Sequence, residues 1–578
     1  MRSHRLLRIC SALILLGVAA PWSRAAPADS GAIQLDQVGF LPGAAKRAAV
    51  APVPAEGFTV VDDESGLDVF SGRLGPPAHW APADADVRLA DFSALTRPGH
   101  YRLHVDGVPD SPRFVIAADA YAALDAAAIR AYYFNRASIA LDPRYAGLYA
   151  RPAGHPDTHV LVHASAASAS RPEGSAISSP GGWYDAGDYN KYVVSSGIAV
   201  YELLAACEHF PGFFAHQSVG LPESGNGAPD LLAEVHWNLA WMLTMQDPAD
   251  GGVHHKLTNK QFDGVVMPDR ATSERYVVGK TTAATLDFAA AMAMASRVYA
   301  PYDKAWPGLS ARMLGAAKAA WRWAQAHPAQ VYRQPPDIRT GEYGDTHLDD
   351  EFAWAAAELY IATHDDAYWV AMHAAQAPMT VPAWNEVGAL GWISLAQHRA
   401  ELTAIADRGL IERRIRTLAQ QLLSDAQASP YRLSMRESDF GWGSNSTALN
   451  RALVMIQGYR LDGDRRLLDA AQTSLDYVLG FNPLGMSMVT GMGTRSPQHP
   501  HHRPSMARGE AVPGFLVGGA NPGQQDAKGC VQRYASSAPA LSYLDADCAF
   551  ASNEVAINWN APLVYVAAAL QALTPAPR

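Results

Sequence analysis

The first part of the chain has the hydropathy pattern of short β-strands. Residues 101–106 alternate apolar and polar side chains with a period of two and end in the turn dipeptide Asp106-Gly107. Short apolar runs at 48–51 and 58–61 are separated by Pro, Gly and Asp. We therefore expect residues 31–116 to form a small all-β sandwich.

Beyond residue 117 the pattern changes to Ala-rich segments of helical period. The spacing is plain at Leu410, Ile411, Ile415, Leu418 and Leu422. A helix that ends in Tyr, an Asp-bearing turn and a second helix recur at 299–303, 360–366 and 459–464. Residues 119–575 are thus expected to form a large all-α domain of paired helices, either a solenoid or a closed ring.

Composition places the chain among ordinary globular proteins. It has 578 residues, a formal net charge of −10, 18% charged and 49% hydrophobic residues. A chain with this acidic balance is not expected to bind nucleic acid.

The N-terminus has the pattern of a secretory signal peptide. Arg2, Arg5 and Arg8 precede an apolar run at 9–20, and a small-x-small exit follows at 23–25. Because the run is too short to span a bilayer, we expect residues 1–25 to be removed and the mature protein, secreted or periplasmic, to have no membrane segment.

Cysteine is scarce beyond this leader. In an oxidising compartment Cys530 and Cys548 could form a disulfide, while Cys207 lies in a helical pattern and is interpreted as a buried free thiol. Three free thiols are the alternative.

Long irregular segments at 151–182 and 492–530 are candidate site loops. The first ends at Asp185 and Asp188, flanked by aromatic residues that include Trp183 and Tyr189. Two carboxylates beside aromatic faces are typical of sugar hydrolysis. A helix cap, a calcium-binding turn or simple core packing would also explain them.

Two further groups lie near the C-terminus. Glu554 opens an apolar helical run without a neighbouring Lys or Arg, and burial there would raise its pKa, as a general acid requires. A capping Glu is the alternative. His501 and Arg503 lie between prolines without the Cys or spaced Glu of a zinc site, which favours hydrogen bonds to sugar hydroxyls over metal binding or surface exposure.

Together these segments resemble the family-nine glycoside hydrolases, inverting cellulases with an (α/α)6 barrel, in the subgroup with an immunoglobulin-like N-terminal domain. Residues 182–189 are similar to the family's Asp-Ala-Gly-Asp loop, 491–503 to its His-x-Arg signature and 543–561 to its Asp/Glu signature. Further similarity covers 251–256 and 349–354.

The resemblance implies roles for individual residues. Asp188 would be the general base, Asp185 would help to hold the water and Glu554 would be the general acid. His501 and Arg503 would bind the sugar, and Asp545 would support the loop of the acid. Further candidate sugar-binding residues are Trp183, Tyr189, His254 and Trp442.

The leading functional hypothesis is an endo-β-1,4-glucanase that cleaves internal bonds of cellulose or soluble β-glucans. Exo-action on short oligosaccharides, as a cellodextrinase, β-glucosidase or exo-glucosaminidase, is the alternative, and a non-catalytic carbohydrate-binding protein a more distant one. No catalytic cofactor is expected; the resemblance allows a structural calcium but assigns no ligands. Because the chain stops at Arg578, soon after the last helix, we expect no cellulose-binding or docking module. We also expect a monomer.

Overall fold

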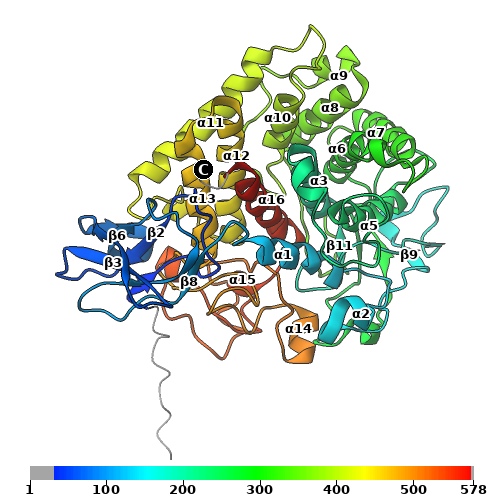
Figure 1. Cartoon of the computed structure of the whole chain (residues 1–578). Coiled ribbons are helices and arrows are strands. Elements are labelled where there is room, and N and C mark those ends of the chain that lie inside the picture. Colours follow the sequence, from blue (N-terminus) through cyan, green and yellow to red (C-terminus); the bar gives the residue numbers. More distant parts are fainter. Residues whose placement is uncertain (1–30, 575–578) are drawn as a thin grey trace, which may run out of the picture.

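The computed structural model describes residues 31–574, so the predicted signal peptide at 1–25 lies outside the described residues. A β-sandwich and a larger helical domain lie side by side, with the sandwich on the left of Figure 1. This is the expected fold class.

The sandwich consists of two four-stranded antiparallel sheets with the strand orders β1-β2-β6-β5 and β4-β3-β7-β8. The strands are β1 (Ile33–Gln34), β2 (Arg47–Val50), β3 (Gly57–Asp62), β4 (Asp68–Arg73), β5 (Ala78–Trp80), β6 (Ala85–Asp91), β7 (Gly99–His104) and β8 (Phe114–Ile116). The period-two pattern of β7 buries Tyr101 and Leu103 among core side chains such as Phe40 and Phe92.

The helical domain alternates outer and inner helices along the chain. The outer helices are α1 (Ala122–Phe134), α5 (Asp230–Met245), α7 (Leu309–Ala326), α9 (Asp366–Ala371), α11 (Arg408–Ala428) and α13 (Arg465–Val478). The inner helices are α3 (Val193–His209), α6 (Thr282–Tyr299), α8 (Asp349–Thr363), α10 (Gly388–Gln397), α12 (Ser444–Asp462) and α16 (Ile557–Leu573). Shorter helices in the loops are α2 (Pro143–Ala146), α4 (Pro211–Phe214), α14 (Arg503–Arg508) and α15 (Phe550–Asn553).

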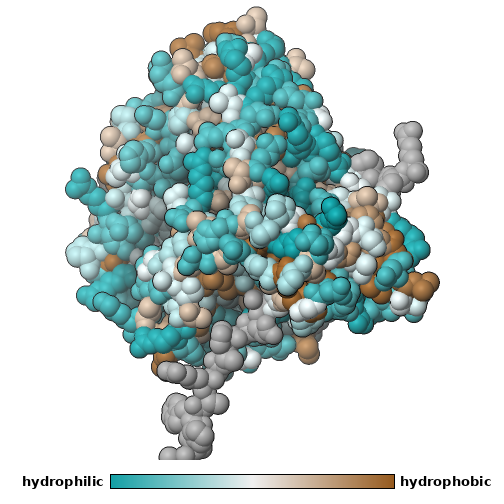
Figure 2. All heavy atoms as spheres, turned by 90° about the vertical axis from the view of Figure 1, so that its left-hand side faces the viewer, coloured by the Kyte–Doolittle hydropathy of each residue, from teal (hydrophilic) through white to brown (hydrophobic). Residues whose placement is uncertain are grey.

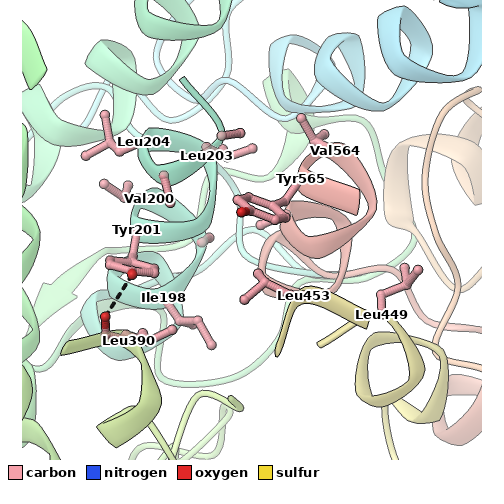
Figure 3. Close-up of a cluster of buried hydrophobic side chains, with 14 of the residues drawn as sticks. Ile198, Val200, Tyr201, Leu203, Leu204, Leu390, Leu449, Leu453, Val564 and Tyr565 are labelled. Atoms are coloured by element: carbon pink, nitrogen blue, oxygen red, sulfur yellow. Dashed lines mark hydrogen bonds between the residues drawn. The ribbon is translucent and has the colours of Figure 1, made fainter. Parts of the chain in front are cut away.

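The helices close into a ring rather than a solenoid. The last helix, α16, packs against both α3 and α12, so the end of the chain meets its beginning. Figure 3 shows apolar side chains of α3, α10, α12 and α16 converging, with the Tyr201 hydroxyl donating to the Leu390 carbonyl at 2.8 Å. Because inner helices have neighbours on all sides, they are apolar almost all round, which the sequence of α16 shows.

The long loops contain a small sheet that the helical pattern did not predict. Its strands are β9 (Val160–Val162), β10 (Ala176–Ile177), β11 (Lys191–Tyr192), β12 (Lys256–Thr258) and β13 (Tyr276–Val277), in the order β10-β9-β13-β12-β11. Strand β11 leads directly into α3, so this sheet fixes the start of an inner helix.

A disulfide joins Cys530 and Cys548, the pairing considered from the cysteine pattern, and Cys207 is a buried free cysteine on α3. Viewed from the sandwich side, the surface is largely hydrophilic with small separate apolar patches (Figure 2). Across residues 31–574, no helix combines the length and apolarity that a membrane crossing requires.

One buried carboxyl group gives the fold a pH dependence. Asp125 on α1 is fully buried; its Oδ2 accepts a hydrogen bond of 2.7 Å from Gln571, and no described residue bonds its Oδ1. Burial raises the pKa of Asp125 to about 8. The unfolded chain ionises this group near pH 4 and the folded chain only near its raised pKa, so stability falls as pH rises between the two.

We predict that Asp125→Asn removes this loss. The free energy of unfolding of the variant, minus that of wild type, should increase by on the order of a few kcal/mol from pH 5 to pH 8. Thermal unfolding at both pH values measures the effect, and Asp119→Asn, at an exposed position, is the matched control. An equal pH dependence of wild type and Asp125→Asn would contradict the assignment.

Candidate active site

A cavity of about 780 Å³ opens at the end of the barrel where inner helices begin. The residues that precede α3, α12 and α16 are Tyr192, Gly443 and Ala556, and all three line the cavity. Ile198, one turn into α3, also lines it and belongs to the apolar barrel core of Figure 3. The cavity therefore rests on the barrel core.

The Asp-Ala-Gly-Asp turn requires its glycine because other backbone passes too close for a side chain. A Cβ at Gly187 would lie 2.3 Å from the His501 carbonyl oxygen and 3.0 Å from Glu554 Oε1. The Gly187 N–H donates to Glu554 Oε1 at 3.3 Å, and its carbonyl accepts from the Arg503 N–H at 3.0 Å. The structure thus brings the predicted acid pair, Glu554 and the His-x-Arg segment into one site.

Asp188 is oriented by one of its two oxygens. Oδ2 accepts hydrogen bonds from the Asn190 side chain and backbone and from the Tyr192 hydroxyl at 3.4 Å. No hydrogen bond from a described residue reaches Oδ1. Because Asp188 lines the cavity, Oδ1 is available to a water or a substrate.

Asp185 lies deeper, with only 1% of its surface exposed. The Tyr343 hydroxyl donates to its Oδ2 at 2.8 Å, and the Ser195 side chain also acts on this buried carboxyl group. Burial and the nearby Asp188 charge raise the pKa of Asp185 to about 7. Because Asp185 lines the cavity together with Asp188, this carboxyl group is placed to help hold a water there.

Glu554 lies between α15 and α16 and is only partly buried. Desolvation, followed by the charges of Asp188 and Asp185, raises the pKa of Glu554 to about 8. The Gly187 N–H and Arg503 act in the opposite direction but do not outweigh burial. At pH 7 this carboxyl group carries a proton that it can donate.

His501 and Arg503 line the cavity beside these acids. His501 Nδ1 pairs with the Asp547 carbonyl at 2.6 Å, and burial lowers the pKa of His501, so its ring is neutral at pH 7. The Arg503 guanidinium donates to Gly187 and Asp263 carbonyls at 2.8 and 2.9 Å.

Asp545 does not line the cavity. It accepts from the backbone N–H groups of Gln498 and His499, both at 2.9 Å, and from Asn553 Nδ2 at 3.1 Å. These bonds join the His-x-Arg segment to the residue before Glu554, so its position is that of a support and not of a group that meets substrate.

The sugar-binding role predicted for three residues does not agree with their burial. Trp183 and His254 are fully buried, Tyr189 is 1% exposed, and none of them lines the cavity. Trp183 Nε1 donates to Glu234, the Tyr189 hydroxyl donates to the Val266 carbonyl, and His254 Nε2 pairs with Arg171. Trp183 and Tyr189 thus anchor the turn that carries Asp185 and Asp188. None of the three rings has the accessible surface that stacking on a sugar requires.

Trp442 does line the cavity and is 48% exposed. Further cavity-lining aromatic residues, which the sequence patterns did not single out, are Phe262, Tyr343, Trp384, Phe550 and Trp559. Phe550 and Trp559 had a local signal, since both lie in the same segment as Glu554. Tyr343 has a φ of +49°, a strained conformation for a bulky residue that often marks functional sites.

Within residues 31–574, no group of three or more His, Cys, Asp or Glu side chains is placed to hold a metal ion. The structural calcium therefore stays a prediction without assigned ligands.

A protonated Glu facing an acid pair in an aromatic-lined cavity on a helical ring defines the class of carbohydrate-cleaving barrel hydrolases. The family profile of glycosyl hydrolase family 9 matches residues 121–567, and that of the cellulase N-terminal Ig-like domain matches residues 28–110. The chain belongs to glycosyl hydrolase family 9 and is a glycoside hydrolase.

Related proteins are similar in sequence to this chain over nearly its whole length. A xyloglucan-specific endo-β-1,4-glucanase of Bacteroides ovatus is 42% identical over 99% of both chains. Endoglucanase D of Acetivibrio thermocellus is 31% identical over 93% of this chain and 83% of its own. A solved Bacteroides ovatus GH9 structure superposes with a TM-score of 0.89 at 41% identity, covering 94% of this chain and 100% of that one.

Tyr343 provides a test of the site geometry. We predict that Tyr343→Phe, which keeps the ring but leaves Asp185 Oδ2 without its donor, lowers kcat by roughly 10- to 100-fold, because hydrogen bonds to charged groups contribute about 1.5–3 kcal/mol. Tyr201→Phe, which removes a buried hydrogen bond in the barrel core, is the control and should retain kcat. An unchanged kcat for Tyr343→Phe would exclude a catalytic effect of this hydroxyl.

Proposed function

We propose that this protein is an inverting endo-β-1,4-glucanase that acts on xyloglucan and related soluble β-1,4-glucans. The observation that carries the reaction is the pairing of Glu554, whose pKa is raised to about 8, with an acid pair on a separate loop. The similarity to a xyloglucan-specific enzyme over 99% of both chains supports the substrate.

In this proposal Glu554 donates its proton to the glycosidic oxygen as the bond to the anomeric carbon breaks. A water attacks that carbon from the opposite face and gives its proton to Asp188, whose Oδ1 is free to accept it. Asp185, which lines the cavity together with Asp188, orients the same water. Glu554 then takes up a proton from solvent and Asp188 releases one, which restores the starting state. The product has the inverted configuration.

Aromatic side chains from two parts of the cavity support binding of a chain of sugars. Tyr343 and Trp384 belong to the segments that precede α8 and α10. Trp442 and Trp559 belong to those around the starts of α12 and α16. Faces presented by four separate segments suit a polymer that lies across the site better than a single terminal sugar.

We also propose that the protein is a monomer exported through its N-terminal leader, with domains at 31–116 and 119–575. The basic and apolar pattern of residues 1–25 supports export, the positions of the two family matches support the domain bounds, and the largely hydrophilic face in Figure 2 supports the monomer.

Conservative substitutions test the catalytic roles. We predict that Asp188→Asn and Glu554→Gln each lower kcat by roughly 10²- to 10⁴-fold while the fold is kept, the range typical of general acid–base catalysis. Reducing-sugar release measures the loss, and Glu437→Gln, at an exposed position, should be as active as wild type. The kcat/KM of the wild type should fall as pH rises through about 8, because Glu554 then loses its proton. Wild-type rates in both variants would refute the roles.

A product-size time course tests the mode of action and the substrate. We expect a rapid fall in the viscosity of xyloglucan with little free monosaccharide, because internal bonds are cleaved. Carboxymethylcellulose and cellotetraose serve as unbranched comparisons. Fast cleavage of cellotetraose without a fall in the viscosity of either polymer would instead identify an exo-acting enzyme.

A further inference from the structure

Lys256 is a buried cation beside the candidate active site that the reaction scheme does not use. It lies on β12, opposite Tyr192 of β11, and has no exposed surface. Its ammonium group donates to Gln334 Oε1 at 3.0 Å, Thr340 Oγ1 at 3.2 Å and the Gly341 carbonyl. All three acceptors are neutral.

Two other lysines of the barrel loops, the buried Lys191 and the half-buried Lys280, have a carboxylate partner. Lys191 lies 2.8 Å from Asp157, and Lys280 lies 2.7 Å from Asp247. For Lys256 no ion pair within 4.0 Å is formed with any residue of 31–574. Burial of a charged group without a direct partner lowers the stability of the fold. We therefore looked for a functional role of Lys256.

The charges that face Lys256 point to that reason. The carboxylates that act on it are Asp188, which is 6% exposed, and Glu342, which is exposed to solvent and therefore screened. On its own strand His255 is neutral, because burial lowers the pKa of His255 to about 3. Asp188 is thus the buried negative charge that interacts with Lys256.

A physical link joins the two groups. The Lys256 ammonium lies 5.4 Å from the centroid of the Tyr192 ring and 5.3 Å from that of Tyr332, within the range of cation–π attraction. The Tyr192 hydroxyl donates to Asp188 Oδ2 at 3.4 Å. Thr340 and Gly341, which hold the ammonium, also line the cavity.

We propose that Lys256 is a positioning residue for Asp188: its ammonium group fixes the Tyr192 ring that hydrogen-bonds the base, and its charge favours the ionised carboxylate. The inference rests on the proposed function, in which Asp188 accepts a proton from water. Burial lowers the pKa of Lys256 to about 7, so the ammonium form predominates below pH 7.

The pH dependence of kcat/KM on cellotetraose tests the proposal. Its acidic limb reports ionisation of the base in the free enzyme. In Lys256→Gln, which keeps a polar side chain but removes the charge, this limb should move to higher pH by about 0.5 to 1 unit. Lys256→Arg, which restores the charge, should keep the limb of the wild type. An unshifted limb in Lys256→Gln would overturn the proposal.

A matched control separates this effect from a general loss of stability. Lys46 is also fully buried, is held by the carbonyl oxygens of Pro42 and Ala44, and lies in the sandwich domain. Lys46→Gln should lower thermal stability without moving the acidic limb. An equal shift in Lys46→Gln would show that the limb reports only global stability and would also overturn the proposal.

If Lys256→Gln does not fold, Tyr192→Phe decides. This variant keeps the ring over the ammonium but removes the hydroxyl from Asp188, so its acidic limb should move in the same direction. A wild-type limb in Tyr192→Phe would then refute the link. Failure of the proposed function would be visible separately, as wild-type rates in Asp188→Asn and Glu554→Gln.

Discussion

The close approach of the Gly187 backbone to His501 and Glu554 is the contact on which the rest of the site depends. It joins a turn before the first inner helix of the chain to the segment before the last one. The Ile557 N–H also donates to the Asp185 carbonyl at 2.8 Å, so the start of α16 is tied to the same turn. Ring closure and assembly of the catalytic groups are therefore one event: the base and the acid, 366 positions apart by their numbers 188 and 554, meet only when α16 reaches α3.

The same packing sets the chemistry. A solvated carboxyl group has a pKa of about 4. Burial among the barrel loops raises the pKa of Glu554 to about 8 and that of Asp185 to about 7. Asp188 lines the same cavity but is held by Asn190 and Tyr192. Similar residue types thus acquire different tasks because their hydrogen-bond partners and their packing differ.

Buried polar groups also mark where the loops are anchored. Trp183 binds Glu234 of α5, and Glu234 pairs with the fully buried Arg136 at 2.9 Å. Tyr189 is fixed by the Val266 carbonyl. These contacts explain why the aromatic residues of this segment are large yet inaccessible: they stiffen the turn that carries Asp185 and Asp188, and the cavity surface is left to Trp442, Trp384 and Tyr343.

The sequence by itself determined the elements and the main chemical groups. Period-two alternation indicated the sandwich, helical spacing indicated the paired helices, and the segments around Asp188, His501 and Glu554 indicated a sugar-cleaving site, because periodicity and residue chemistry are local properties. Only the tertiary structure decided ring closure, the small sheet that holds β11, the burial of Trp183, Tyr189 and His254, and the approach of Tyr343 to Asp185. Exposure and long-range contacts depend on which distant segments pack together, and no local pattern contains that information.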